Sequence, residues 1–144
     1  MNNYFKYPNY NYQMNPANPK NMQQNDYNNL NLFTPYEGFI KGNMFPSLYN
    51  SYRGMKPFQI KPINEQAEML TTIDSLGFAT IDLNLYLDVN PDDKKAIDLF
   101  NQYRKQKEEL MKKYQEKYGP IELSSDSLNN YPWMWDNRPW PWEN

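Results

Sequence analysis

The chain contains neither cysteine nor histidine among its 144 residues. Without cysteine there is no disulfide, no thiolate metal site and no thiol nucleophile. Without histidine the chain lacks the commonest general base and transition-metal ligand. Histidine-based triads, zinc hydrolases and haem sites with histidine or cysteine ligands are therefore excluded. No glycine-rich phosphate loop is present either, so we predict no enzyme activity, no catalytic residue, no metal and no cofactor.

Long apolar runs and clustered charge are also missing. Hydrophobic residues make up 39% of the chain, the mean hydropathy is −1.02, and no segment approaches the ~20 apolar residues of a membrane span. The N-terminus lacks the apolar run of a secretory signal. The net charge is only −2, without the clustered positive charge that neutralises phosphates. We therefore expect a protein made in the cytosol that neither crosses the bilayer nor binds nucleic acid.

The first 31 residues are rich in turn-forming side chains. They contain eleven asparagines, five tyrosines and three prolines, with few aliphatic residues. This composition predicts a disordered arm over residues 1–31, with an adhesive polar and aromatic arm as the alternative. Residues 32–63 hold many large apolar groups but show no sustained period, and proline and glycine interrupt them. We predict an irregular segment that becomes ordered only where its side chains find a surface.

Helical patterns occupy residues 64–119. Apolar residues repeat at spacings of four and three, which is a helical seam, at Met69, Ile73, Leu76, Thr80, Leu83 and Leu87. Asn64 is the predicted cap of a helix over about 65–88. Asn90 and Pro91 are expected to begin a second helix, over about 91–118, that ends at Gly119. The short connection makes the two helices antiparallel neighbours, with Lys113 or Lys117 near Glu65 or Glu68.

A metal site at the turn between the two helices is not predicted. Asp88, Asn90 and Asp92 have the spacing at which a calcium-binding loop begins. However, Asp93 stands where that loop needs a turning glycine, and Leu99 stands where it needs a bidentate glutamate. We interpret these polar residues as helix caps.

All four tryptophans lie within the last twelve residues, in a tail over residues 120–144. Prolines at 132, 139 and 141 exclude a regular helix or central strand there. Two helices cannot cover each other's apolar faces, so a third surface is needed. We expect the aromatic segment 32–52, the tail, or both to lie along the hairpin. The tail either clamps onto its own hairpin or binds a partner.

Several short motifs resemble the spore-coat CotJB family of endospore-forming bacteria over residues of about 66–142. They are Leu85-Tyr86-Leu87-Asp88, Pro91-Asp92-Asp93, Phe100-Asn101, Lys117-Tyr118-Gly119-Pro120, Tyr131-Pro132-Trp133-Met134-Trp135 and Pro139-Trp140-Pro141-Trp142. The segment at about 33–52 is similar to the companion CotJA-type coat protein. That likeness rests on Pro35-Tyr36-Glu37-Gly38-Phe39, Gly42-Asn43-Met44-Phe45 and Leu48-Tyr49.

The resemblance implies a protein of the inner spore coat, made in the mother-cell cytoplasm and assembled into the coat. It implies other coat proteins as partners, among them a manganese-catalase-like component, and self-association is left open. An adaptor that recruits or stabilises that enzyme is the alternative function. The fold expected is all-α, an antiparallel two-helix hairpin with irregular flanks. The residues expected to make protein contacts are Pro35, Tyr36, Gly38, Phe39, Met44, Phe45, Tyr49, Tyr131, Trp133, Trp135, Trp140 and Trp142.

Overall fold

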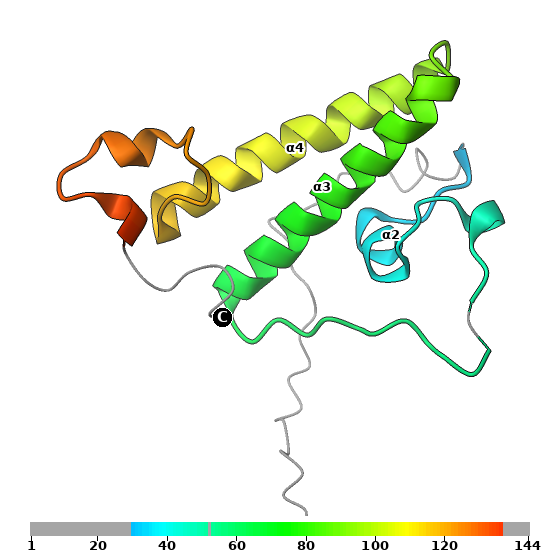
Figure 1. The fold of residues 1–144 in the computed structure, drawn as a ribbon, viewed down its shortest axis with the longest axis horizontal. Coiled ribbons are helices and arrows are strands. Elements are labelled where there is room, and N and C mark those ends of the chain that lie inside the picture. The colour runs from blue at the N-terminus through cyan, green and yellow to red at the C-terminus, as the bar shows by residue number, and fades with distance from the viewer. Residues whose placement is uncertain (1–29, 52, 137–144) are drawn as a thin grey trace, which may run out of the picture.

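The computed structural model describes residues 30–51 and 53–136, and this part of the chain contains helices and no strand (Figure 1). Two long helices dominate it, α3 (Glu65–Val89) and α4 (Lys94–Tyr118). A short helix, α2 (Pro35–Lys41), precedes them, and three 3-10 turns complete the fold: η2 (Pro46–Leu48), η3 (Asp126–Asn129) and η4 (Met134–Asp136). The predicted all-α fold and helical hairpin are confirmed. Most of the arm predicted over 1–31 lies outside the described residues.

Helix α3 begins where the sequence predicts. The Asn64 side chain accepts a hydrogen bond of 2.7 Å from the backbone N–H of Ala67, and Glu65 and Glu68 occupy the first turn. A side-chain oxygen at this position satisfies one of the free amides of the first turn, and acidic groups suit the positive end of the helix dipole. The helix then continues for 25 residues to Val89.

The start of α4 differs from the prediction. Asn90 does not cap it, because its side-chain amide donates back to the Tyr86 carbonyl at 2.9 Å and closes the C-terminus of α3. Asp93 is the cap instead, and its carboxylate accepts from the backbone N–H of Ala96 at 3.1 Å. Helix α4 therefore begins at Lys94, three residues later than expected, and Pro91 lies in the turn between the helices.

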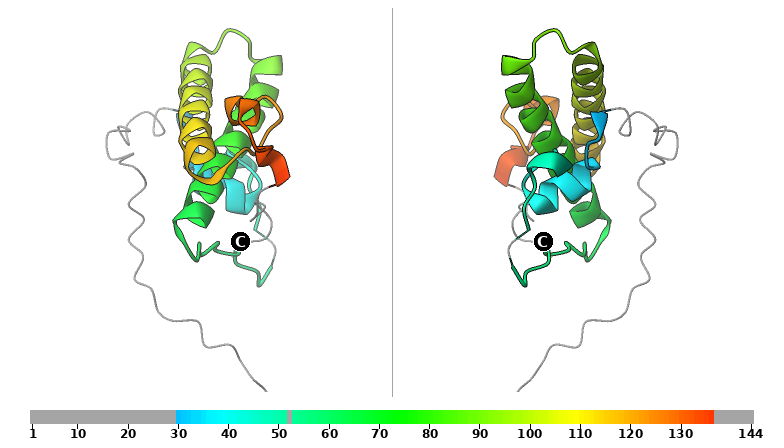
Figure 2. Two further views of the ribbon diagram at one scale, coloured as in Figure 1. Left: turned by 90° about the vertical axis from the view of Figure 1, so that its left-hand side faces the viewer. Right: turned by 90° about the vertical axis from the view of Figure 1, so that its right-hand side faces the viewer.

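The two long helices share a core and run antiparallel, as Figure 2 shows from both sides of the hairpin. The buried residues of this core come from α3 and α4, together with one methionine from the N-terminal segment. They are Met44, Leu76, Ala79, Leu83, Ala96, Leu99 and Tyr103. At the open end of the hairpin Lys117 approaches Glu65, with 2.6 Å between the ammonium and the carboxylate. The predicted pairing of the end of the second helix with the start of the first is thus confirmed.

The segment predicted to be irregular contains a helix that the sequence analysis missed. Thr34 and Glu37 form a reciprocal capping box at the start of α2, and Pro35 occupies the first turn. Proline fits there because the first helical amides have no partner within the helix. Gly42 ends the helix in the left-handed conformation, with φ of 71°. Leu30 and Leu32, which precede α2, also pack against the core.

Candidate interaction surfaces

The N-terminal aromatic segment, residues 32–49, is anchored on α3 by Met44. The Met44 side chain is completely buried in the hairpin core. Its backbone N–H donates to the Asp82 carboxylate at 2.7 Å, and its carbonyl accepts from the N–H of Phe33 at 2.9 Å. Because both backbone groups and the side chain are engaged, this segment is the third layer that the hairpin requires.

Two aromatic pairs hold the same segment along α3. The rings of Phe39 and Phe78 have centroids 6.1 Å apart, and those of Phe45 and Tyr86 are 5.2 Å apart. Both spacings lie in the range in which aromatic pairs attract. Gly38 is buried in α2, and a Cβ at this position would clash with the side chain of Met44. Phe39 and Phe45 are only partly buried.

The predicted contact residues Tyr36 and Tyr49 also contact the chain itself. The Tyr36 hydroxyl makes hydrogen bonds of 3.1 Å with both the N–H and the carbonyl of Ile60. It thereby joins α2 to the linker, the stretch of chain between η2 and α3. Tyr49 packs edge-on against Phe33, with centroids 5.9 Å apart. The Lys41 ammonium lies 3.6 Å from the centre of the Phe33 ring, a cation–π contact that the sequence analysis did not single out.

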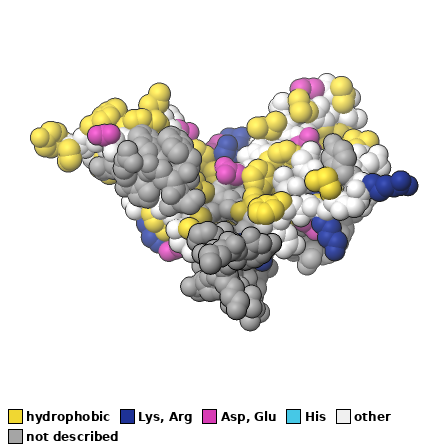
Figure 3. Space-filling view, turned by 60° about the horizontal axis from the view of Figure 1, so that its bottom comes forward, with side chains coloured by type: hydrophobic (Ala, Val, Ile, Leu, Met, Phe, Trp, Pro, Cys, Tyr) yellow, Lys and Arg dark blue, Asp and Glu magenta, His cyan; other side chains and the backbone are white. Residues whose placement is uncertain are grey.

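The C-terminal tail leaves the end of α4 and folds into the turns η3 and η4, which contact each other (Figure 1). Tyr131 is 99% exposed and Trp133 is 57% exposed, whereas Trp135 is partly buried. Trp140 and Trp142 lie outside the described residues. Figure 3 shows hydrophobic side chains gathered in several patches on one face of the molecule. The tail therefore presents at least two large rings to solvent.

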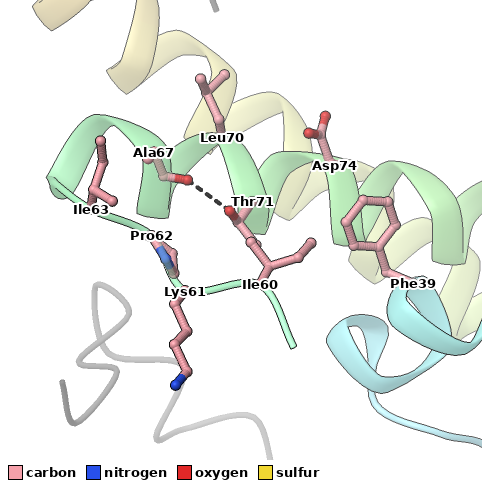
Figure 4. A pocket seen from close by; sticks show the side chains of 9 residues that line it. All are labelled: Phe39, Ile60, Lys61, Pro62, Ile63, Ala67, Leu70, Thr71 and Asp74. Carbon is pink, nitrogen blue, oxygen red and sulfur yellow. Dashed lines mark hydrogen bonds between the residues drawn. The ribbon is translucent and has the colours of Figure 1, made fainter. Parts of the chain in front are cut away.

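A pocket of about 380 Å³ lies between α2, the linker and the first half of α3 (Figure 4). Its lining is mostly apolar and consists of Phe39, Ile60, Lys61, Pro62, Ile63, Ala67, Leu70, Thr71 and Asp74. Burial raises the pKa of Asp74, and the neighbouring Lys107 only partly opposes this. No local pattern in the sequence indicates the pocket, because the Tyr36–Ile60 contact that holds the linker against α2 joins residues far apart in the chain.

The described ranges contain no group of three or more Asp and Glu side chains placed to hold a metal ion. Within the same ranges no helix has the length and apolar character that crossing a bilayer requires.

The family model for the CotJB protein matches residues 67–143, which is more than half of the chain. The chain belongs to the CotJB family. It is therefore a component of the spore coat, the layer that a cell builds during sporulation. No match was found among curated proteins or among solved structures.

The CotJB match begins inside α3 and continues through the tail. It includes α4, the turn and the exposed rings of the tail, but not residues 30–51 with α2 and Met44. The similarity of the segment at 33–52 to a CotJA-type protein accordingly stays a prediction. The contact role of the twelve residues named in the sequence analysis stays a prediction as well.

Proposed function

We propose that this CotJB-family protein is a non-enzymatic structural protein of the inner spore coat that assembles by aromatic docking of its C-terminal tail. The observation that supports the proposal most directly is the exposure of Tyr131 and Trp133 on a tail of short turns. Trp135, Trp140 and Trp142 belong to the same contact set. The partners are other coat proteins, including the manganese-catalase-like component that the resemblance implies.

Exposed rings of this size favour binding over solvation. Tyrosine and tryptophan bury a large area while losing few rotamers, and they dominate the binding energy of many interfaces. Truncating a ring to alanine at a hot spot of such an interface weakens the binding free energy by about 2 kcal/mol or more. The prolines in the tail fix its backbone, so less conformational entropy is lost when it docks.

The N-terminal aromatic segment, residues 32–49, contributes to the proposed docking in two ways. Gly38 and Met44 are buried in the chain's own core and hold the segment in place. Phe39, Phe45 and Tyr49, in the same segment, are only partly buried. We propose that these three aromatic residues form a second contact surface for a coat partner.

The test of tail docking is a pulldown from sporulating cells with the catalase-like component as the readout. Three forms of the full chain are compared: wild type, a deletion of residues 131–144, and Trp133→Ala. Phe58→Ala is the matched control, because Phe58 is an aromatic residue that is 82% exposed and lies in the linker instead of the tail. We expect the deletion and Trp133→Ala to weaken capture and the control to leave it unchanged. Equal capture by all four proteins would show that the tail is not the docking element.

Fractionation of spore coats separates a structural component from an adaptor for the enzyme. A structural protein persists in coats of cells that lack the catalase-like component, whereas a pure adaptor is lost with it. We expect the protein to remain in the inner coat fraction of such cells. Its disappearance from those coats would replace the structural function by the adaptor function.

A further inference from the structure

One face of α3 remains uncovered in spite of its apolar character. Ile81, Leu85 and Val89 follow one another at intervals of four residues and therefore form a single stripe along the helix. They are 65%, 59% and 79% exposed. Three neighbouring aliphatic side chains exposed to this degree are unusual on a helix that already packs on two other sides.

The stripe lies beyond the pocket on the same side of α3, apart from the two sides of the helix that are packed. The core seam of α3 faces α4 through Leu76 and Leu83, and the side that carries Asp82 faces the segment around Met44. Residues 81, 85 and 89 belong to neither set. They span eight residues, about 12 Å along the helix. A partner helix of ordinary length can cover them.

The charge around the stripe selects the kind of partner. Helix α3 contains the acidic residues Glu65, Glu68, Asp74, Asp82 and Asp88 and no lysine or arginine. Asp74 and Asp88 are each seven residues from Ile81, on the same face of the helix, and both are exposed. Lys107 of α4 lies beside Asp74 and offsets part of its charge, but it does not reach the end of the stripe at Asp88.

A second copy of this chain fits the stripe poorly. Two α3 helices placed face to face would bring acidic side chains together, and like charges across an interface disfavour association. The solvent face of α4 has no such stripe. Among the exposed large hydrophobic residues of the described ranges, only Ile97 belongs to α4, and it is 36% exposed. The occupant must therefore bring both apolar groups and positive charge.

We propose that the Ile81–Leu85–Val89 stripe is the docking site for a basic amphipathic helix of another protein. Aliphatic side chains of that helix at intervals of three or four residues pack between Ile81, Leu85 and Val89. Its lysines or arginines, about 14 residues or ~21 Å apart, lie near Asp74 and Asp88. The site is separate from the tail, so loss of tail docking and loss of this contact can be told apart.

The probe is a synthetic helical peptide of about 18 residues with leucines on one face and lysines around them. Its binding to the full-length protein is measured by fluorescence anisotropy. Two control peptides have glutamate in place of lysine, or the same composition with the leucines scattered. We expect the lysine peptide to bind and both control peptides to bind at least about tenfold more weakly, because one lacks the charge and the other lacks the apolar face.

Protein variants locate the binding site. Ile81→Gln with Leu85→Gln should weaken binding at least about tenfold. Asp74→Asn with Asp88→Asn should weaken it several-fold at low salt and reduce its dependence on salt. The matched controls, Leu123→Gln and Glu109→Gln, change exposed residues elsewhere and should leave affinity unchanged. Footprinting of the wild-type protein should show protection of residues 81–89 by the peptide, which does not depend on any variant folding.

Three results would overturn the proposal. The first is no binding of the lysine peptide, or equal binding of the scattered peptide. The second is binding that the stripe variants leave unchanged while footprinting shows protection elsewhere. The third is self-association of the wild-type protein, seen by sedimentation equilibrium, that the stripe variants abolish, since this would make a second copy the occupant.

Discussion

Replacing Met44 with alanine would truncate the side chain that the N-terminal segment buries completely in the hairpin core. Met44 has no exposed surface and belongs to the same buried cluster as Leu76, Leu83 and Tyr103. Truncation of a buried methionine costs 2–5 kcal/mol, because apolar contact is lost and a cavity remains. We expect a loss of about 3 kcal/mol in the free energy of unfolding, since the backbone hydrogen bonds of residue 44 can persist. The Tm should fall by about 10–20 °C.

The measurement is urea denaturation of the full chain, followed by far-ultraviolet circular dichroism. Met55→Ala is the matched control, because Met55 is 67% exposed and its truncation should change stability by less than about 0.5 kcal/mol. Met44→Leu, which nearly conserves volume, should cost less than about 1.5 kcal/mol. If Met44→Ala behaved like Met55→Ala, the segment would not be part of the core, and the three-layer packing described above would be wrong.

Three further substitutions test local features of the helices by urea denaturation. Gly77→Ala should raise the free energy of unfolding by about 0.5–1 kcal/mol, because an added Cβ in mid-helix meets a lysine side chain no closer than 3.5 Å. Asp93→Ala should cost about 1 kcal/mol at pH 7. The backbone hydrogen bond from Ala96 lowers the pKa of Asp93, so this contribution is present above the ordinary value of about 3.9 and should disappear as the pH falls through the lowered pKa. Tyr114→Phe should cost about 1–3 kcal/mol by leaving the buried Gln66 amide without its 2.8 Å acceptor.

The hairpin could be predicted because its signals are local. A cap at Asn64, apolar spacings of four and three, and Gly119 after the second helix determine element type and approximate length without reference to the rest of the chain. The start of α4 was harder to predict because two polar residues three positions apart, Asn90 and Asp93, can each serve as its cap. Asn90 can cap a helix that follows it or close one that precedes it, and the choice depends on which backbone groups its amide reaches.

Helix α2 illustrates the opposite case. Its capping box, Thr34 and Glu37, is visible in the sequence, as is Gly42 at its end. With seven residues, however, the helix is far shorter than the ~12–15 that an isolated helix needs in water. Its stability comes from packing against α3, which no local pattern reveals. The interaction surfaces follow the same logic, since the tail rings stand out in the sequence but what they contact does not.

The composition of α3 explains why the hairpin needs its flanking segment. A helix with apolar residues on every side belongs in the interior of a structure, and α3 has α4 on one side and the Met44 segment on another. The CotJB match begins at residue 67 and so contains α3 without the segment that covers its second side. A hairpin of this kind lacking residues 30–49 would leave open the place in the core that Met44 fills beside Asp82, and a separate polypeptide would have to fill it. Covalent attachment of that segment makes the contact intramolecular and raises its effective concentration to the millimolar range. If residues 33–52 are the CotJA-like unit, this packing is the physical advantage of joining the two in one chain.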